Sequence, residues 1–179
     1  MDSRKLAIAL ALILVIGLAI FNLSTSGGSG GEPLKGADEL STLADDRLEG
    51  AVLKELGRDA YREGAPPDAW RKLNEKARNL WSVAAIRDID AVVGLPGWFK
   101  SIELGATTPS PEDMRDGLEA LGLDEARRVM AEIITQRAST DKAVLSKLHG
   151  RLNKALADKT ALKTRQAWVR DNLHALLKR

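Results

Sequence analysis

An all-α fold is predicted for this chain: one N-terminal transmembrane helix, then a soluble multi-helix domain that ends in a helical C-terminal segment. Three observations predict it. An uncharged apolar run lies near the start, leucines then recur at spacings of three and four residues, and no stretch alternates apolar and polar residues as a half-buried strand would. Hydrophobic residues make up 44% of the 179 and charged residues 29%, as in ordinary globular proteins. Without the run and its linker, a little under 150 residues remain, about the size of one domain.

The apolar run, Leu6 to Leu23, is predicted to be a membrane anchor. It has about 18 uncharged residues, close to the ~20 that cross a bilayer as a helix. A cleaved signal peptide is the alternative, but its apolar core is usually ~7–15 residues long and a small-residue cleavage site follows it. Residues 21–26 offer no Ala-x-Ala step, and the chain has no cysteine that could be acylated. We therefore interpret residues 1–23 as a retained signal anchor.

The charges beside the anchor predict its orientation. Arg4 and Lys5 precede it, whereas the nearest basic residue beyond it is Lys35, which has acidic neighbours. Basic flanks stay in the cytoplasm, so the soluble domain should face outward, into the periplasm, from a bacterial inner membrane that the chain crosses once. Residues 24–36 are rich in Gly and Ser and are predicted to form a flexible linker with an end-to-end distance of roughly 20 Å.

Residues 37–179 are predicted to form the all-α soluble domain, beginning with helices at 37–48 and 50–62, or with the second one starting at Asp45 and Asp46. Gly64 to Pro67 should end this part, because proline cannot continue a helix. A helix from 68 to 93 follows and carries two tryptophans on one apolar stripe. Core packing is the favoured role of these tryptophans, and a binding platform is the alternative.

The next stretch, residues 87–102, contains the candidate partner-binding surface. Gly94, Pro96 and Gly97 predict a tight corner between helices, directly followed by aromatic residues. Acidic residues precede the corner, near the C-terminal end of a helix, where the dipole disfavours negative charge. They could be solvated, cap the corner, contact a partner or bind a metal. The candidate partner-binding residues are Asp88, Asp90, Trp98 and Phe99.

Beyond a loop at 105–111, Ser110 is predicted to cap a helix whose first-turn acids, Glu112 and Asp113, have a structural role. Gly122 should end that helix, and a second helix from Leu123 would complete an αα-hairpin.

Residues 80–134 resemble the DNA-mimic-protein family of small bacterial all-helical domains. The resemblance rests on the acids before the corner, on the glycines and aromatics of the corner and on the hairpin: Asp88, Asp90, Gly94, Gly97, Trp98, Phe99, Leu118, Ala120, Leu121, Gly122 and Leu123. The corner reads Gly-Leu-Pro-Gly-Trp-Phe where the family has Asn-Gly-Gly-Phe. The resemblance implies a helical protein-interaction domain, which in some members acts as a decoy for DNA-binding proteins.

The final segment, residues 137–179, is basic, whereas the preceding body is acidic. Residues 137–179 hold 11 Lys or Arg against 3 Asp or Glu, and residues 32–136 hold 14 against 21. A leucine seam from 145 to 176 follows helical spacing, as one helix or as two with a hinge at 158–160. The segment could pack on the acidic body (37–136), form an arm for a partner or for self-association through the seam, or approach an anionic surface such as lipid headgroups. No nucleic acid is expected as a partner.

No motif for catalysis is found, and we expect no enzyme, no cofactor and no metal. His149 and His174 are the only histidines, and neither has a second ligand at metal-binding spacing. The sequence therefore predicts a membrane-tethered, non-catalytic adaptor, scaffold or regulatory subunit that binds an unidentified protein in the periplasm. A cytoplasm-facing decoy for a DNA-binding protein is the alternative, and a hydrolase is a third hypothesis.

Overall fold

The computed structural model describes residues 35–61, 65–66, 68–92, 94–103, 108–139 and 141–178. These residues form nine α-helices and one short 3-10 helix, with no strand among them, so the all-α prediction is confirmed for this part of the chain. The predicted anchor at 1–23 and the linker up to residue 34 lie outside the described residues. Within those residues, no helix is both long and apolar enough to span a bilayer.

The N-terminal half contains α2 (Ala37–Ser41), α3 (Asp45–Ala60), the 3-10 helix η1 (Ala69–Lys72) and α4 (Glu75–Val92). The predicted break between residues 48 and 50 is wrong, and the alternative, in which the second helix starts at Asp45 and Asp46, is confirmed. The chain instead leaves the helical conformation between Ser41 and Asp45, and the acidic pair begins α3, where carboxylates suit the positive end of the helix dipole.

The helix predicted from 68 to 93 is two elements. Leu73 is extended, with φ −60° and ψ 152°, and it separates η1 from α4. Asn74 stabilises this break, because its side-chain oxygen accepts a hydrogen bond from the Ala77 backbone N–H at 3.1 Å and so caps α4. Trp70 is 3% exposed and therefore belongs to the core, as the sequence favoured, but it lies in η1 and not on the α4 stripe.

The middle of the chain forms α5 (Gly94–Glu103), α6 (Pro111–Ala120) and α7 (Asp124–Thr135). Ser110 is the N-cap of α6, as predicted, and it forms a capping box with Asp113. Gly122 lies in the hairpin turn with φ +70°. Helices α4 and α6 approach closely at Gly117, where a β-carbon would lie 2.7 Å from the Asn79 carbonyl oxygen.

The C-terminal segment forms α8 (Lys142–Ala157), α9 (Lys159–Asp171) and α10 (Leu173–Leu176), so the two-helix alternative is the one observed. Asp158 lies at the elbow, and its carboxylate accepts hydrogen bonds from the Thr160 and Ala161 N–H groups at the start of α9. Most of the predicted seam is buried within the chain, with exposures of 7% or less at Leu145, Leu148, Leu152, Val169, Leu173 and Leu176. Its other two members, Ala155 and Leu162, are partly buried.

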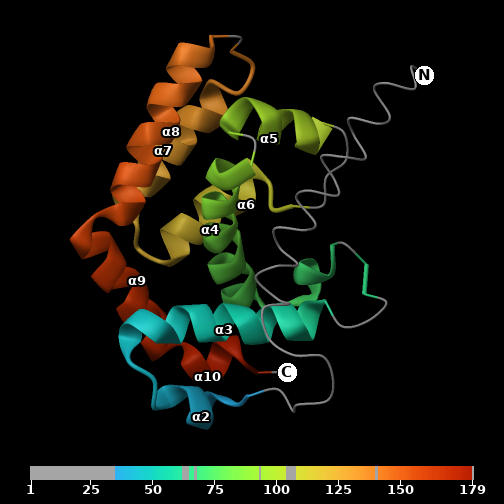
Figure 1. The fold of residues 1–179 in the computed structure, drawn as a ribbon, viewed down its shortest axis with the longest axis vertical. Helices are drawn as coiled ribbons and strands as arrows, with labels where there is room; N and C mark the ends of the chain where they lie inside the picture. The colour runs from blue at the N-terminus through green and yellow to red at the C-terminus, as the bar shows by residue number, and fades with distance from the viewer. Residues whose placement is uncertain are drawn as a thin grey trace.

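The helices surround one hydrophobic core, with α4 through the middle of the molecule (Figure 1). Helices α2 and α10 lie at one end, together with the C-terminus, while α5 and the start of α8 lie at the other end. Asn74 reinforces this arrangement, because its amide donates a hydrogen bond to the Ala175 carbonyl oxygen at 3.0 Å. Helix α4 starts near α10 and has 18 residues, so it spans about 27 Å toward the corner with α5.

Candidate functional site

The corner between α4 and α5 contains the candidate partner-binding residues. The corner is shorter than predicted, because α5 already begins at Gly94, whose φ of +61° is a conformation that glycine adopts most easily. The other corner residues are inside α5, where proline is tolerated in the first turn. Asp88 and Asp90 lie in the last turns of α4, and the orientation of their side chains is outside the described part.

Trp98 and Phe99 take different positions at this corner. Trp98 is 2% exposed and belongs to the hydrophobic core, whereas Phe99 is partly buried against that core. Their ring centroids are 5.2 Å apart with planes tilted by 32°, a favourable aromatic arrangement. Phe99 is thus the candidate aromatic that a partner could reach, and Trp98 supports it from beneath.

A second cluster, which the sequence did not reveal, joins the acidic body to the C-terminal segment. Glu49 on α3 is 8% exposed, and its carboxylate accepts a hydrogen bond from the Arg165 Nε on α9 at 2.6 Å. Arg87 on α4 donates to the other oxygen of the same carboxylate at 3.3 Å. Burial lowers the pKa of Arg165, with Glu49 opposing the shift, and an arginine remains charged in such a site. The cluster is a buried ionic link between three helices.

Three more arginines of the C-terminal segment bind carboxylates of the body. Arg170 binds Asp45 and also donates to the Ser41 and Leu43 carbonyl oxygens at 2.7 and 2.6 Å, so it fastens the α2–α3 connection. Arg151 forms a bidentate pair with Glu132, with distances of 2.6 and 3.0 Å, and this pairing lowers the pKa of the glutamate. Arg137 pairs with Glu112 at 3.2 Å.

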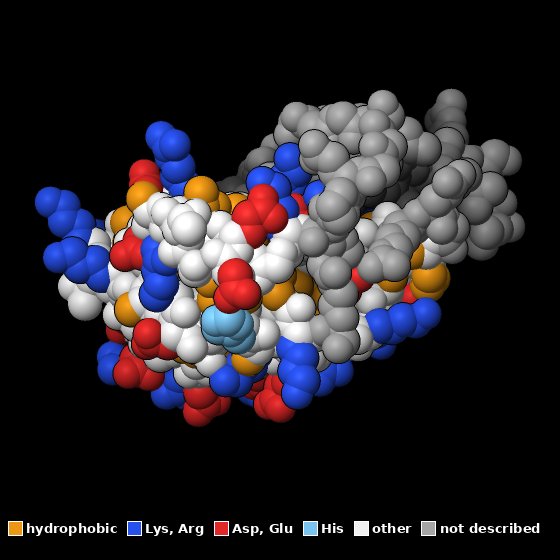
Figure 2. All heavy atoms as spheres, turned by 90° about the horizontal axis from the view of Figure 1, so that it is seen from below, with side chains coloured by type: hydrophobic (Ala, Val, Ile, Leu, Met, Phe, Trp, Pro, Cys, Tyr) orange, Lys and Arg blue, Asp and Glu red, His pale blue; other side chains and the backbone are white. Residues whose placement is uncertain are grey.

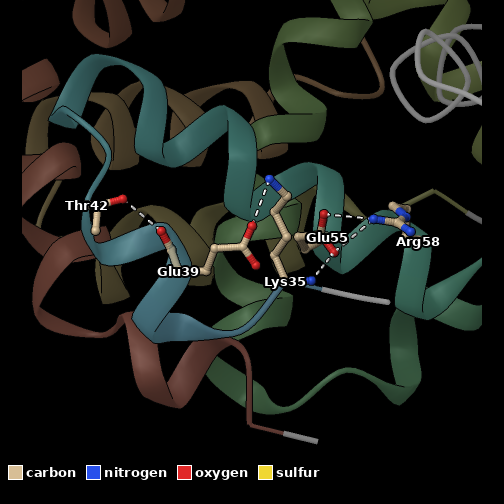
Figure 3. A network of polar contacts seen from close by, with 5 residues as sticks. All are labelled: Lys35, Glu39, Thr42, Glu55 and Arg58. Atoms are coloured by element: carbon tan, nitrogen blue, oxygen red, sulfur yellow. Dashed lines mark hydrogen bonds and ion pairs between the residues drawn. The ribbon is translucent and has the colours of Figure 1, made fainter. Parts of the chain in front are cut away.

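The start of the described chain is held by another buried carboxylate, Glu55 (Figure 3). Glu55 is 3% exposed and accepts a hydrogen bond from the Lys35 backbone N–H at 3.0 Å and another from Arg58 at 3.1 Å. The Lys35 ammonium pairs in turn with Glu39 on α2 at 3.0 Å. The point at which the predicted linker joins the domain is therefore fixed to α3.

These contacts are ion pairs and hydrogen bonds that join helices. Within the described residues, no group of three or more His, Asp or Glu side chains is placed to hold a metal ion. The pKa of Tyr61 is raised to about 12, chiefly because the phenol is buried, and its ring lies 5.8 Å from that of Trp81. Each of these groups has a packing or anchoring role.

Comparison with known proteins found no match to this chain among family models, curated proteins or solved structures. The resemblance of residues 80–134 to the DNA-mimic-protein family thus stays an expectation that rests on the motif alone.

Proposed function

We propose that this chain is a membrane-tethered protein-interaction domain, an adaptor, scaffold or regulatory subunit, that faces the periplasm and contacts its partner at the α4–α5 corner. The anchor and its orientation come from the apolar run Leu6 to Leu23 and from the basic residues before it. The fold adds support, since the linker joins the body at the end that holds α2 and α10. The corner is about 27 Å away along α4, so a partner can reach it without contacting the attachment point.

The corner has the elements that a contact surface needs. Phe99 offers a half-buried ring that Trp98 keeps in place, and aromatic side chains with such support are frequent anchors of protein interfaces. Two carboxylates in the last turns of α4 would add charge that selects a basic surface on the partner. The observation that carries the proposal is the position of Phe99, a half-buried aromatic packed on Trp98 at the end of the domain far from the linker.

The alternative, a cytoplasmic decoy for a DNA-binding protein, has less support. A decoy needs a continuous negative surface, but Asp45, Glu49, Glu112 and Glu132 of the acidic body are each paired with an arginine of the C-terminal segment. The pairing neutralises much of the charge asymmetry that the sequence displays.

Two experiments on the full chain test the proposal. A C-terminal reporter that is active only outside the cytoplasm should be active, and a reporter active only inside should be silent; the opposite result would favour the decoy. A photoreactive amino acid at Phe99 should then give a discrete cross-linked product in cells, and the same residue at exposed Lys54 on α3 should not. The product should disappear with D88N/D90N. Equal products at both positions would refute the corner as the contact surface.

A further inference from the structure

We infer that the outer face of α8 and α9 is a docking surface for anionic phospholipid headgroups, which orients the tethered domain on the membrane. The inference rests on the proposed anchor and adds a second, reversible contact. It comes from a division between arginines and lysines in the basic C-terminal segment. Every described arginine of that segment, at 137, 151, 165 and 170, binds a carboxylate of the body.

The lysines of the same helices do the opposite. Lys147, Lys154, Lys159 and Lys163 are exposed, and within the described part of the chain none of them forms a hydrogen bond or an ion pair. Lys147 and Lys154 are seven residues apart and so share one face of α8, opposite the buried leucines. Lys163 likewise lies opposite the buried Arg165 and Val169 on α9. These four residues define the lysine face.

Few negative charges oppose the lysine face. Helices α8 and α9 and their elbow contain two acidic residues, Asp158 and Asp171. Asp158 is committed to capping α9, and the hydrogen bonds from Thr160 and Ala161 lower its pKa. The end of the domain at α2 and α10 differs, because acidic and basic side chains alternate over its described part (Figure 2). Asp124 and Glu125 at the start of α7 line a pocket together with Lys154 and Asp158, so acidic side chains border the α8 part of the lysine face, whereas Lys159 and Lys163 do not line this pocket.

The composition of this face favours lipid over a protein partner. Around the lysines the exposed residues of α8 and α9 are mostly small or polar, and they include Ala143, Ser146, Gly150, Ala157, Thr160 and Ala167. The exception is Val144 near the start of α8, which is 38% exposed. The centres of protein interfaces are rich in aromatics and arginine and poor in lysine, so such a face lacks the anchors of a protein contact. Headgroup attraction needs only charge near the surface, and lysine supplies that as a compact, hydrated ion.

The position of the lysine face also suits a tethered domain. Arg170 lies in the last turn of α9 and joins it to the α2–α3 connection, so α9 ends beside the end of the domain at which the linker enters. Lys163 is seven residues from Arg170, about 10 Å along the helix. A tether raises the local concentration of the face at the membrane, so weak attraction is enough to hold it there. The α4–α5 corner would remain accessible, because α5 packs on the inner side of α8, away from the lysines.

The test uses the full chain reconstituted in phosphatidylcholine vesicles with or without about 30% phosphatidylglycerol. The chain has no cysteine, so Ala157→Cys gives one labelling site at the end of α8, and energy transfer to an acceptor lipid reports how close that site lies to the bilayer. Transfer should rise with phosphatidylglycerol and fall as salt is raised. Each lysine near an anionic surface is worth up to about fivefold, so K147Q/K154Q/K159Q/K163Q should lower the docked-to-free ratio at least about tenfold.

A matched control separates a specific face from net charge. K54Q/K72Q/K100Q/K178Q removes four exposed lysines from other parts of the surface and should leave energy transfer nearly unchanged. Equal loss in both variants, or no response to phosphatidylglycerol, would overturn the inference and favour a protein partner for the lysine face. A separate flotation assay tests the anchor: if residues 1–23 do not insert into the bilayer, the chain will not float with pure phosphatidylcholine vesicles. Phosphatidylglycerol-dependent flotation would then still report on the lysine face.

Discussion

The buried pair between Glu49 and Arg165 permits a quantitative test of how the C-terminal segment is held. Arg165→Met removes a guanidinium that is 4% exposed and leaves the carboxylate buried at 8% exposure. Leaving one member of a buried ion pair without its partner typically costs about 3–5 kcal/mol. Arg87 cannot compensate fully, because its side chain is 52% exposed and its contact with Glu49 is longer, at 3.3 Å. We therefore expect R165M to lower the free energy of unfolding by about 3 kcal/mol or more.

Two further variants make this test sharp. R87M should cost less than about 1 kcal/mol, because half-exposed ion pairs contribute little. The double variant E49L/R165M should be far more stable than the sum of its single changes, since no buried charge remains. Urea unfolding of the full chain in bilayer discs can be followed by fluorescence, because all four tryptophans lie between residues 70 and 168. A cost below about 1 kcal/mol for R165M, or additive costs in the double variant, would refute the reasoning.

Three further predictions follow from packing and titration. Gly117→Ala should destabilise by about 1–3 kcal/mol in urea unfolding, because its β-carbon would lie 2.7 Å from the Asn79 carbonyl oxygen. Gly150→Ala, a helix-interior change that meets nothing within 4 Å, should instead stabilise by about 0.5–1 kcal/mol; equal effects would contradict the packing argument. Tyr61 is the only tyrosine, and its absorbance at high pH should show a pKa near 12 and not near 10.0. Its contribution to stability is therefore present below pH 10.0 and is lost as the pH approaches 12. A midpoint near 10.0 in the folded protein would exclude burial of the phenol. Because the pKa of Asp158 lies below its ordinary 3.8, its contribution to the α8–α9 elbow is present above that pH and lost as the pH falls through the lowered value. D158N can still cap the helix, so amide exchange at Thr160 should depend less on pH in this range; an unchanged pH dependence would remove Asp158 as the cause.

Much of the helical architecture could be predicted because its signals are local. A capping side chain acts within three residues of the helix start, as Ser110 and Asp113 do at α6, and a glycine stop such as Gly122 acts at one position. The seam from 145 to 176 was predicted for the same reason, since helical spacing alone determines which residues share a face. These features do not depend on the partner against which each helix packs.

The errors occurred where distant contacts decide the local structure. Asn74 caps α4 and also binds the carbonyl oxygen of Ala175, about a hundred residues away, so the break before α4 stabilises two parts of the chain together. Arg170 likewise holds the Ser41 and Leu43 carbonyl oxygens and stabilises the connection that replaces the predicted helix at 37–48. Residue spacing in one segment contains no information about such partners.

The charge asymmetry between the body and the C-terminal segment also could not reveal which basic residues form ion pairs within the chain. Net charge treats arginine and lysine alike, but their side chains differ physically: the arginine fork binds a carboxylate in a fixed plane and tolerates burial, while the lysine ammonium remains strongly hydrated. Arg165 shows the first behaviour at Glu49, and Lys163, two residues earlier on α9, shows the second. One basic segment therefore does two things: its arginines hold it to the acidic body, and its lysines remain available for an external anionic surface. A lysine-to-arginine exchange at Lys163 should thus preserve lipid docking. Arg165→Lys should weaken the fold despite its unchanged charge, because an ammonium is more strongly hydrated than a guanidinium and costs more to bury beside Glu49.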